Sequence, residues 1–225
     1  MMALEEGWGT ATVIPEPDRR PVPWEDPQLS RWVGFYRTLR DLLFSPGEFF
    51  ETLGRAGWAE PLAFALIAST VGLLFTFFWH LLILAGGGDT GGAVYSLGLG
   101  PAALLGLMVA TPILVLVDLG VGCLCWWGSV AVSGADRDFT PAWRIFCYAH
   151  GAMVLGVIPI LGMLVAGLWF LALLYIGARK VLELSALGSL GSLGVYLAFQ
   201  ALLGIIFLLG LIVCLSGLGF LALLA

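Results

Sequence analysis

The chain has 225 residues, of which 60% are hydrophobic and only 11% are charged. Soluble domains carry about 25% charged residues, so this composition excludes an ordinary soluble protein and indicates a membrane protein. Most of the net charge of −5 comes from residues 1–60, and the chain has no basic stripe that would follow a row of phosphates. The composition therefore predicts no nucleic-acid partner.

Residues 1–27 begin the chain with proline, glycine and acidic residues. Such a segment cannot bury enough apolar surface to fold alone, so we predict a flexible cytoplasmic tail. It contains no basic region followed by an apolar run, which argues against a cleavable signal peptide. The predicted organisation is this tail, a surface segment over residues 28–60 and a membrane domain over residues 61–225.

Residues 28–44 have the periodicity of an amphipathic helix. One face carries Leu29, Trp32, Val33, Tyr36, Leu39 and Leu43, and the other face is polar. A helix with aromatic residues on one side and arginine on the other is typical of the membrane interface. We expect Trp32 and Tyr36 to contact lipid or a protein partner at the cytoplasmic face, with Arg31 and Arg37 directed toward anionic headgroups.

The stretch "LFSPGEFF" then carries the start signal of a second, short helix. Ser45 is expected as the N-cap, Pro46 as the first helical residue and Glu48 as the last member of an S-x-x-E capping box. This pattern predicts an elbow helix over residues 46–53 that turns the chain toward the bilayer. We expect Phe49 and Phe50, which lie on it, to contact lipid or a partner.

Apolar runs long enough to cross a bilayer, which takes roughly 20 residues, occupy most of the remaining chain. They cover residues 62–85, 101–132 and 193–225, with a longer run between residues 143 and 178. Pro159 and Gly162 interrupt the longer run, so we divide it into spans over 143–158 and 161–178 joined by a tight hairpin. The predicted fold is an all-α integral membrane protein with five transmembrane helices, preceded by an amphipathic interfacial helix and a short elbow helix.

The basic residues predict the orientation of these spans. All nine arginines and the single lysine fall within residues 1–60, 133–144 and 177–191, which lie on one side of the membrane if there are five spans. Because cytoplasmic loops carry the excess of Lys and Arg, this side is predicted to be cytoplasmic. We therefore expect a cytoplasmic N-terminus and a C-terminus outside.

Four polar residues within the apolar runs are candidates for function, because such residues are costly in a bilayer. They are Asp118, Tyr148, His150 and Gln200. Asp118 is either a neutral, buried carboxyl group hydrogen-bonded to a neighbouring helix, which we favour, or a group that handles protons or ions. His150 has no partner residue at metal-ligand spacing, so we expect a packing or hydrogen-bonding role there and no metal site.

Two stretches, "LLFSPGEFFETL" before the first span and "FTPAWRIFCYAHGAMVLGVIPILG" over residues 139–162, have a distinctive pattern. Both resemble the Yip domain family of Rab-GTPase-interacting membrane proteins. The second is similar to the family's helix entry, Tyr-Ala pair and hairpin proline, here Tyr148, Ala149 and Pro159. The resemblance covers about residues 30–215 and implies five transmembrane helices with a cytoplasmic N-terminus. The excess of arginine over lysine suggests a bacterial member of the inner membrane, to which the GTPase partner does not carry over.

The sequence shows no pattern typical of an enzyme: no nucleophile with a base, no phosphate-binding loop and no dense metal-ligand cluster. We therefore expect a non-enzymatic protein without a cofactor, which contacts membrane lipids and organises the membrane or binds a partner at its cytoplasmic face. The alternative is a small transporter, channel or lipid-moving protein, acting as a homo-oligomer, with Asp118 and His150 on its path.

Overall fold

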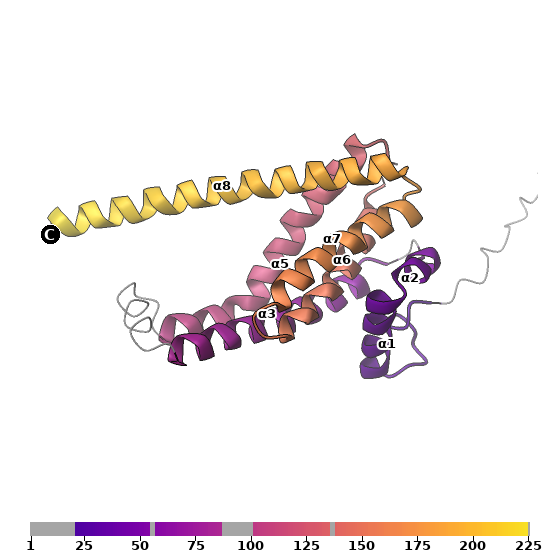
Figure 1. Cartoon of the computed structure of the whole chain (residues 1–225), viewed down its shortest axis with the longest axis horizontal. Helices are drawn as coiled ribbons and strands as arrows, with labels where there is room; N and C mark the ends of the chain where they lie inside the picture. Colours follow the sequence, from indigo (N-terminus) through magenta and orange to yellow (C-terminus); the bar gives the residue numbers. More distant parts are fainter. Residues whose placement is uncertain (1–20, 55–56, 87–100, 136–137, 225) are drawn as a thin grey trace, which may run out of the picture.

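The structure is a computed structural model that describes residues 21–54, 57–86, 101–135 and 138–224. Every regular element in these residues is a helix. In chain order they are α1 (Arg31–Phe44), α2 (Pro46–Thr52), α3 (Ala59–Gly86), α5 (Pro101–Val132), α6 (Phe139–Ala149), the 3₁₀ helix η1 (His150–Val157), α7 (Gly162–Lys180) and α8 (Ala186–Leu224). Figure 1 shows α1 and α2 across one end of a bundle formed by the longer helices.

Four of the described helices are long and apolar enough to cross a membrane. They are Ala59–Leu82, Met108–Val132, Gly162–Lys180 and Ala186–Gly210. These helices correspond to the first, second, fourth and fifth predicted spans, so an all-helical fold with several candidate spans is confirmed. The predicted third span, residues 143–158, is instead formed by two shorter elements, α6 and η1.

The segment formed by α6 and η1 runs beside α3 in the same direction. Near its start, the indole Nε1 of Trp143 donates to the carbonyl oxygen of Trp58 at 3.0 Å. At its end, the Val157 carbonyl oxygen accepts from Nε1 of Trp79 at 2.9 Å. The stretch from residue 58 to residue 79 is about 31 Å long at 1.5 Å per residue. Together α6 and η1 therefore follow α3 over roughly the thickness of a bilayer core.

The backbones of α3 and η1 meet at two glycines. A Cβ atom added to Gly72 would overlap the carbonyl oxygen of Met153, and one added to Gly156 would lie 2.6 Å from the carbonyl oxygen of Gly72. Only residues without a side chain fit such an approach. The 3₁₀ form also suits the segment, because it is narrower than an α-helix and rises about 2.0 Å per residue.

The core of the bundle is centred on α6, whose residues from Arg144 to Ala149 are all buried. Phe146 packs edge-on against Phe170 of α7 with ring centroids 5.6 Å apart, and Tyr148 lies 5.3 Å from Phe64 of α3. The α6 helix begins where Asp138 caps it, accepting a hydrogen bond from the backbone N–H of Thr140. The first half of the predicted third span, residues 144–149, thus lies in the interior of the bundle.

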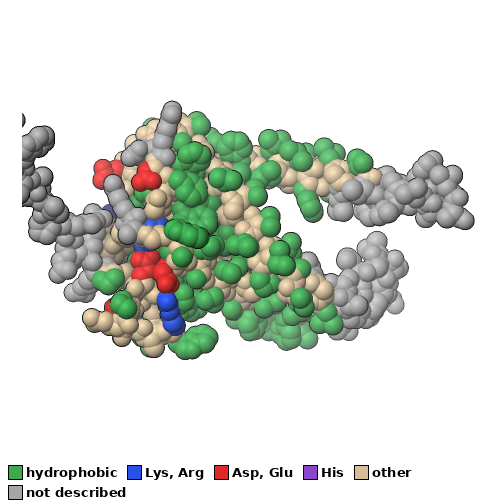
Figure 2. Space-filling model, turned by 180° about the vertical axis from the view of Figure 1, so that it is seen from behind, with side chains coloured by type: hydrophobic (Ala, Val, Ile, Leu, Met, Phe, Trp, Pro, Cys, Tyr) green, Lys and Arg blue, Asp and Glu red, His purple; other side chains and the backbone are tan. Residues whose placement is uncertain are grey.

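One end of the bundle gathers the three basic segments that the sequence placed on one side of the membrane. Lys180 at the end of α7 pairs with Glu51 of α2, and Arg144 of α6 pairs with Glu25. Figure 2 shows the charged side chains at this end, with a hydrophobic surface along the rest of the visible face. The described parts of these segments therefore lie at one end of the bundle (Figure 2).

The segment before α1 is packed, which corrects the predicted tail. Residues 21–30, here called the strap, bury Val22 and Trp24 against the bundle. The backbone N–H of Trp24 donates to Oγ1 of Thr38, and its indole Nε1 donates to the carbonyl oxygen of Glu60. The prediction of a flexible tail over residues 1–27 is therefore wrong for residues 21–27, and residues 1–20 lie outside the described residues.

The elbow helix α2 begins at Pro46 as predicted, but the predicted capping box is not formed. The Ser45 side chain makes no capping hydrogen bond. The reason is that Ser45 also terminates α1, with its N–H donating to the Asp41 carbonyl oxygen and its backbone at φ −139° and ψ 50°. Its own carbonyl oxygen accepts from the N–H of Phe49, so the backbone alone joins the two helices.

The last helix, α8, begins at Ala186, seven residues before the predicted start of the fifth span at residue 193. Its first turns pack on the bundle and bury Ser189, Ser192 and Tyr196. Residues 201–210 are all exposed, and Figure 1 shows this part of α8 leaving the other helices. Residues 201–210 of α8 thus lie exposed on a stretch of helix that leaves the rest of the bundle (Figure 1).

Candidate functional site

Helix α1 has two different faces at the end of the bundle. Thr38 and Leu42 are fully buried, and a Cβ atom on Gly34 would lie 2.5 Å from the Pro23 carbonyl oxygen. The opposite face is open, with Trp32 exposed to 82% and Tyr36 to 66%. The side that looked polar in sequence therefore packs on the strap, because small side chains let the strap approach closely. The aromatic side chains of this face are therefore largely exposed, while Leu39 beside them packs partly against the core.

Arg31 is held by the first turn of α3. Its guanidinium makes two hydrogen bonds to the Glu60 carboxylate, at 2.8 and 3.2 Å, and lies over the Trp24 ring at 5.1 Å. The hydrogen bond to Glu60 raises the pKa of Arg31. The carboxylate therefore offsets the charge of Arg31, whose side chain is still 65% exposed, and the contact of Arg31 with anionic headgroups stays a prediction. Arg37 is exposed and borders a cavity on the other side of α1.

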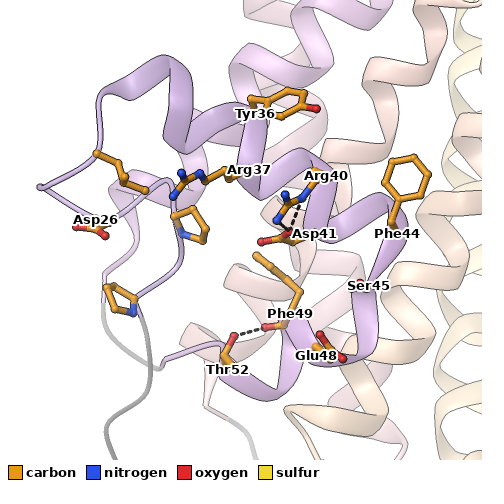
Figure 3. Close-up of a pocket in the computed structure, with 13 residues that line it drawn as sticks. Asp26, Tyr36, Arg37, Arg40, Asp41, Phe44, Ser45, Glu48, Phe49 and Thr52 are labelled. Carbon is orange, nitrogen blue, oxygen red and sulfur yellow. Dashed lines mark hydrogen bonds and ion pairs between the residues drawn. The ribbon is translucent and has the colours of Figure 1, made fainter.

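That cavity lies between the strap, α1 and α2 and has a volume of about 920 Å³. It is lined by Pro21, Pro23, Asp26, Leu29, Tyr36, Arg37, Arg40, Asp41, Phe44, Ser45, Glu48, Phe49 and Thr52. Figure 3 shows Arg37, Arg40 and Asp41 on the α1 wall, with Glu48 and Phe49 on α2. Arg40 pairs with Asp41 at 2.9 Å. The cavity thus combines both signs of charge with aromatic rings, a lining suited to a protein segment of mixed character.

Phe49 and Phe50 do not form part of an exposed surface. They are only 5% and 1% exposed, and the Phe49 ring packs at 5.2 Å from the ring of Tyr148. Both residues therefore attach α2 to the bundle, and the prediction that Phe50 contacts lipid or a partner is wrong. Phe49 also lines the cavity, so its contact with a partner stays a prediction. A helix of seven residues is too short for its buried face to be read from periodicity.

Tyr148 belongs to a polar cluster that joins the strap to α6. Its hydroxyl donates to Oε1 of Glu25 at 2.6 Å, and Nη2 of Arg144 lies 3.0 Å from Oε2 and 2.7 Å from Oε1 of the same carboxylate. Nη1 of Arg144 also donates to the Gly57 carbonyl oxygen at 3.0 Å. Sequence reasoning identified Tyr148 but missed Glu25 and Arg144, because it assigned Glu25 to a flexible tail.

Asp118 and His150, the two sharpest intramembrane candidates, are brought together between α5 and the start of η1. Nε2 of His150 lies 3.5 Å from Oδ2 of Asp118. Nδ1 of His150 lies 2.9 Å from the Phe146 carbonyl oxygen. A carbonyl only accepts, so Nδ1 carries its hydrogen and Nε2 is the nitrogen that faces the carboxyl group. From the sequence we favoured a buried Asp118 side chain, and this prediction is wrong because the side chain is 65% exposed.

Gln200 of α8 makes a side-chain hydrogen bond within its own helix. Its Nε2 donates to the hydroxyl of Tyr196 at 2.8 Å. Tyr196 is buried, with its ring edge-on to Trp126 of α5 at 6.0 Å. The sequence did not single out Tyr196, although a polar aromatic residue four positions before an intramembrane glutamine is a usable signal.

The sequence model of one protein family, described as the Yip1 domain, matches residues 40–209 of the chain. This chain belongs to the Yip1 domain family. Comparisons with curated proteins and with solved structures find no match. As a Yip1-domain protein it is a multi-span membrane protein, and the resemblance seen in the sequence is confirmed over the matched residues.

The limits of the Yip1 domain divide the candidate residues into two groups. The match includes α2, Arg144, Tyr148, the Asp118–His150 pair and Gln200. The strap and the exposed Trp32 and Tyr36 precede residue 40 and lie outside it. Among the described residues, histidine, cysteine, aspartate and glutamate form no group of three that would hold a metal ion. The family model therefore does not cover the strap or the first turns of α1.

Proposed function

We propose that this protein is a non-enzymatic membrane module of the Yip type that docks a protein partner at the end formed by the strap, α1 and α2. The observation that carries this proposal is the 920 Å³ cavity beside an α1 face whose aromatic residues, Trp32 and Tyr36, are largely exposed. Exposed aromatic and arginine side chains are the types enriched in protein interfaces. Phe44 and Tyr36 supply the apolar surface, while Arg37, Asp26 and Glu48 supply charges of both signs.

The proposal includes five crossings, with α6 and η1 together as the third. Their path beside α3 from Trp58 to Trp79 supports this number. Since every basic residue falls in the segments at one end, we place that end in the cytoplasm and the C-terminus outside. The nine arginines against one lysine support the inner membrane of a bacterium.

The test is extraction of the tagged full-length protein in mild detergent, followed by mass measurement of the intact complex and identification of its components. We expect a partner in fixed stoichiometry that is lost in Tyr36→Ser/Arg37→Glu. The matched control is Arg179→Glu, because Arg179 is an exposed arginine at the same end but outside the cavity. A partner retained equally by both variants, or no partner at all, would refute docking at the cavity.

A second candidate function is transport, favoured by the approach of Asp118 to His150 at 3.5 Å. A partly exposed carboxyl group beside a buried imidazole is typical of a path for protons or cations through a membrane. In this candidate, a second copy of the chain covers the exposed part of α8, and the intact mass would give that of a homo-oligomer. The test is proton or cation flux into liposomes containing the purified protein, expected to fall at least tenfold in Asp118→Asn. Flux that does not change in this variant would exclude a role for the carboxylate.

A further inference from the structure

A second hollow lies on the other side of α1, between that helix and the start of α3. It has a volume of about 570 Å³. Its walls are apolar: Trp32 and Phe35 come from α1, Ala63 and Ile67 from α3, and Trp24 from the strap. Ile67 lies about 10 Å beyond Glu60 along α3 at 1.5 Å per residue, so the groove follows this helix into the bundle's apolar zone.

The polar edge of this groove is the Arg31–Glu60 ion pair. The two side chains are 65% and 42% exposed, so both charges remain reachable from outside while they hold each other at 2.8 Å. An exposed pair of this kind contributes little to stability and is easily opened. The groove therefore offers a positive and a negative group side by side, with no net charge, at the point where α3 enters its apolar run.

We propose that this groove binds a zwitterionic phospholipid. The lipid phosphate binds Arg31, the lipid ammonium binds Glu60, and one acyl chain lies along Ala63 and Ile67 beneath Trp32. Charge complementarity supports this choice, because an anionic headgroup would satisfy Arg31 but lie against the Glu60 carboxylate. Guanidinium groups bind phosphate oxygens in a two-pronged geometry, which Arg31 already shows toward Glu60.

This inference rests on the proposed position of α1 at the membrane surface, but its test does not. The experiment is a titration of the full-length protein in detergent with phosphatidylethanolamine, phosphatidylcholine or phosphatidylglycerol, with bound lipid counted by native mass spectrometry. We expect the two zwitterionic lipids to bind about fivefold more tightly than phosphatidylglycerol, the scale of one exposed charge contact. Equal binding of all three, or preference for phosphatidylglycerol, would overturn the assignment.

Variants then locate the site. Glu60→Gln should remove the preference for zwitterionic lipid, and exchange of the charges in Arg31→Glu/Glu60→Arg should restore it. Ala63→Trp should fill the groove and abolish the bound lipid. Ala198→Trp, at an exposed alanine of α8, is the matched control and should retain it. A lipid count that survives Ala63→Trp, or a protein that co-purifies in place of lipid and is lost in that variant, would show that the groove has another occupant.

Partner docking at the cavity and lipid binding in the groove can be tested independently of each other. The Tyr36→Ser/Arg37→Glu variant changes only the cavity side of α1 and should retain its lipid preference. The Ala63→Trp variant changes only the groove and should retain the protein partner. Loss of both ligands in either variant, with an unchanged unfolding temperature, would contradict the separation of the two sites on opposite sides of α1.

Discussion

Arg144 carries its positive charge at a position where the side chain is only 1% exposed. A buried charge is tolerated when hydrogen-bonding and ionic partners surround it, and here the Glu25 carboxylate and the Gly57 carbonyl supply them. The Lys180–Glu51 pair at the same end is chemically similar, but both of its side chains are about half exposed. These two ion pairs should therefore differ greatly in their contribution to stability.

Replacement of Glu25 by alanine should lower the free energy of unfolding by about 3 kcal/mol, because the Arg144 charge would remain buried without its carboxylate. The same replacement at Glu51 should cost less than about 1 kcal/mol, as expected for an exposed pair. Both values can be measured from thermal or denaturant unfolding in detergent. Equal effects of the two substitutions would contradict the assignment of Arg144 as a buried, paired charge.

Individual candidate residues could be identified from the sequence only where they differ sharply from their neighbours in the chain. Asp118 and His150 stand out because they interrupt apolar runs, and the structure brings them together. Glu25 did not stand out, because it lies among other acidic residues and its partner Arg144 is 119 positions away. Contacts of such sequence separation leave no periodic signal in a single chain.

At the scale of elements, the crossing of α3 and η1 depends on glycine. Gly72→Ala should destabilise the protein by about 2 kcal/mol or more, because the added methyl group overlaps the Met153 carbonyl oxygen and two backbones must separate. Gly120→Ala in α5 is the control, since a Cβ atom there meets nothing within 4 Å. Alanine has a higher helix propensity than glycine, so the Gly120→Ala control should be neutral or slightly stabilising. Comparison of unfolding temperatures checks both, and equal stability would refute the close crossing.

The placement of α1 predicts different depths for its two sides. Spin labels at Trp32→Cys and Arg37→Cys, in a protein whose native cysteines are replaced, report depth through collision with oxygen or with a water-soluble nickel complex. After reconstitution into bilayers, the label at residue 32 should collide more with oxygen and the label at residue 37 more with nickel. If both labels collide mainly with the nickel complex, α1 lies outside the membrane and the prediction is wrong.

The four long helices and the two surface helices, α1 and α2, were predictable, but the conformation of the α6–η1 segment was not. Runs of apolar residues gave α3, α5, α7 and α8, since a bilayer imposes a minimum length on each. The α6–η1 segment was correctly separated from α7 at Pro159, but its 3₁₀ half was not foreseen, because close backbone packing at Gly72 selects that form. The predicted capping box at Ser45 is not formed for a related reason. Ser45 is at once the C-cap of α1 and the N-cap of α2, and the S-x-x-E motif describes only the second of these positions.

For the whole molecule, five passes and four passes place the C-terminus on opposite sides. If α6 and η1 cross the membrane, a tag after Ala225 lies on the side opposite a cysteine introduced at the exposed Ser45. Labelling of both sites with a membrane-impermeant reagent, in intact cells and in inverted vesicles, distinguishes the two arrangements. We expect the tag to react in intact cells and Ser45→Cys to react only in inverted vesicles. Reaction of both on the same side would exclude the third crossing.

The contact between the strap and α6 also imposes an order on biosynthesis. Glu25 is synthesised 119 residues before Arg144 and 123 residues before Tyr148. At a translation rate of about 5–20 residues per second, it waits about 6–24 s for them. In that interval α3 and α5 enter the membrane, and the carboxylate has neither partner until α6 follows. The strap can therefore close on α6 only after α3 and α5 have been synthesised.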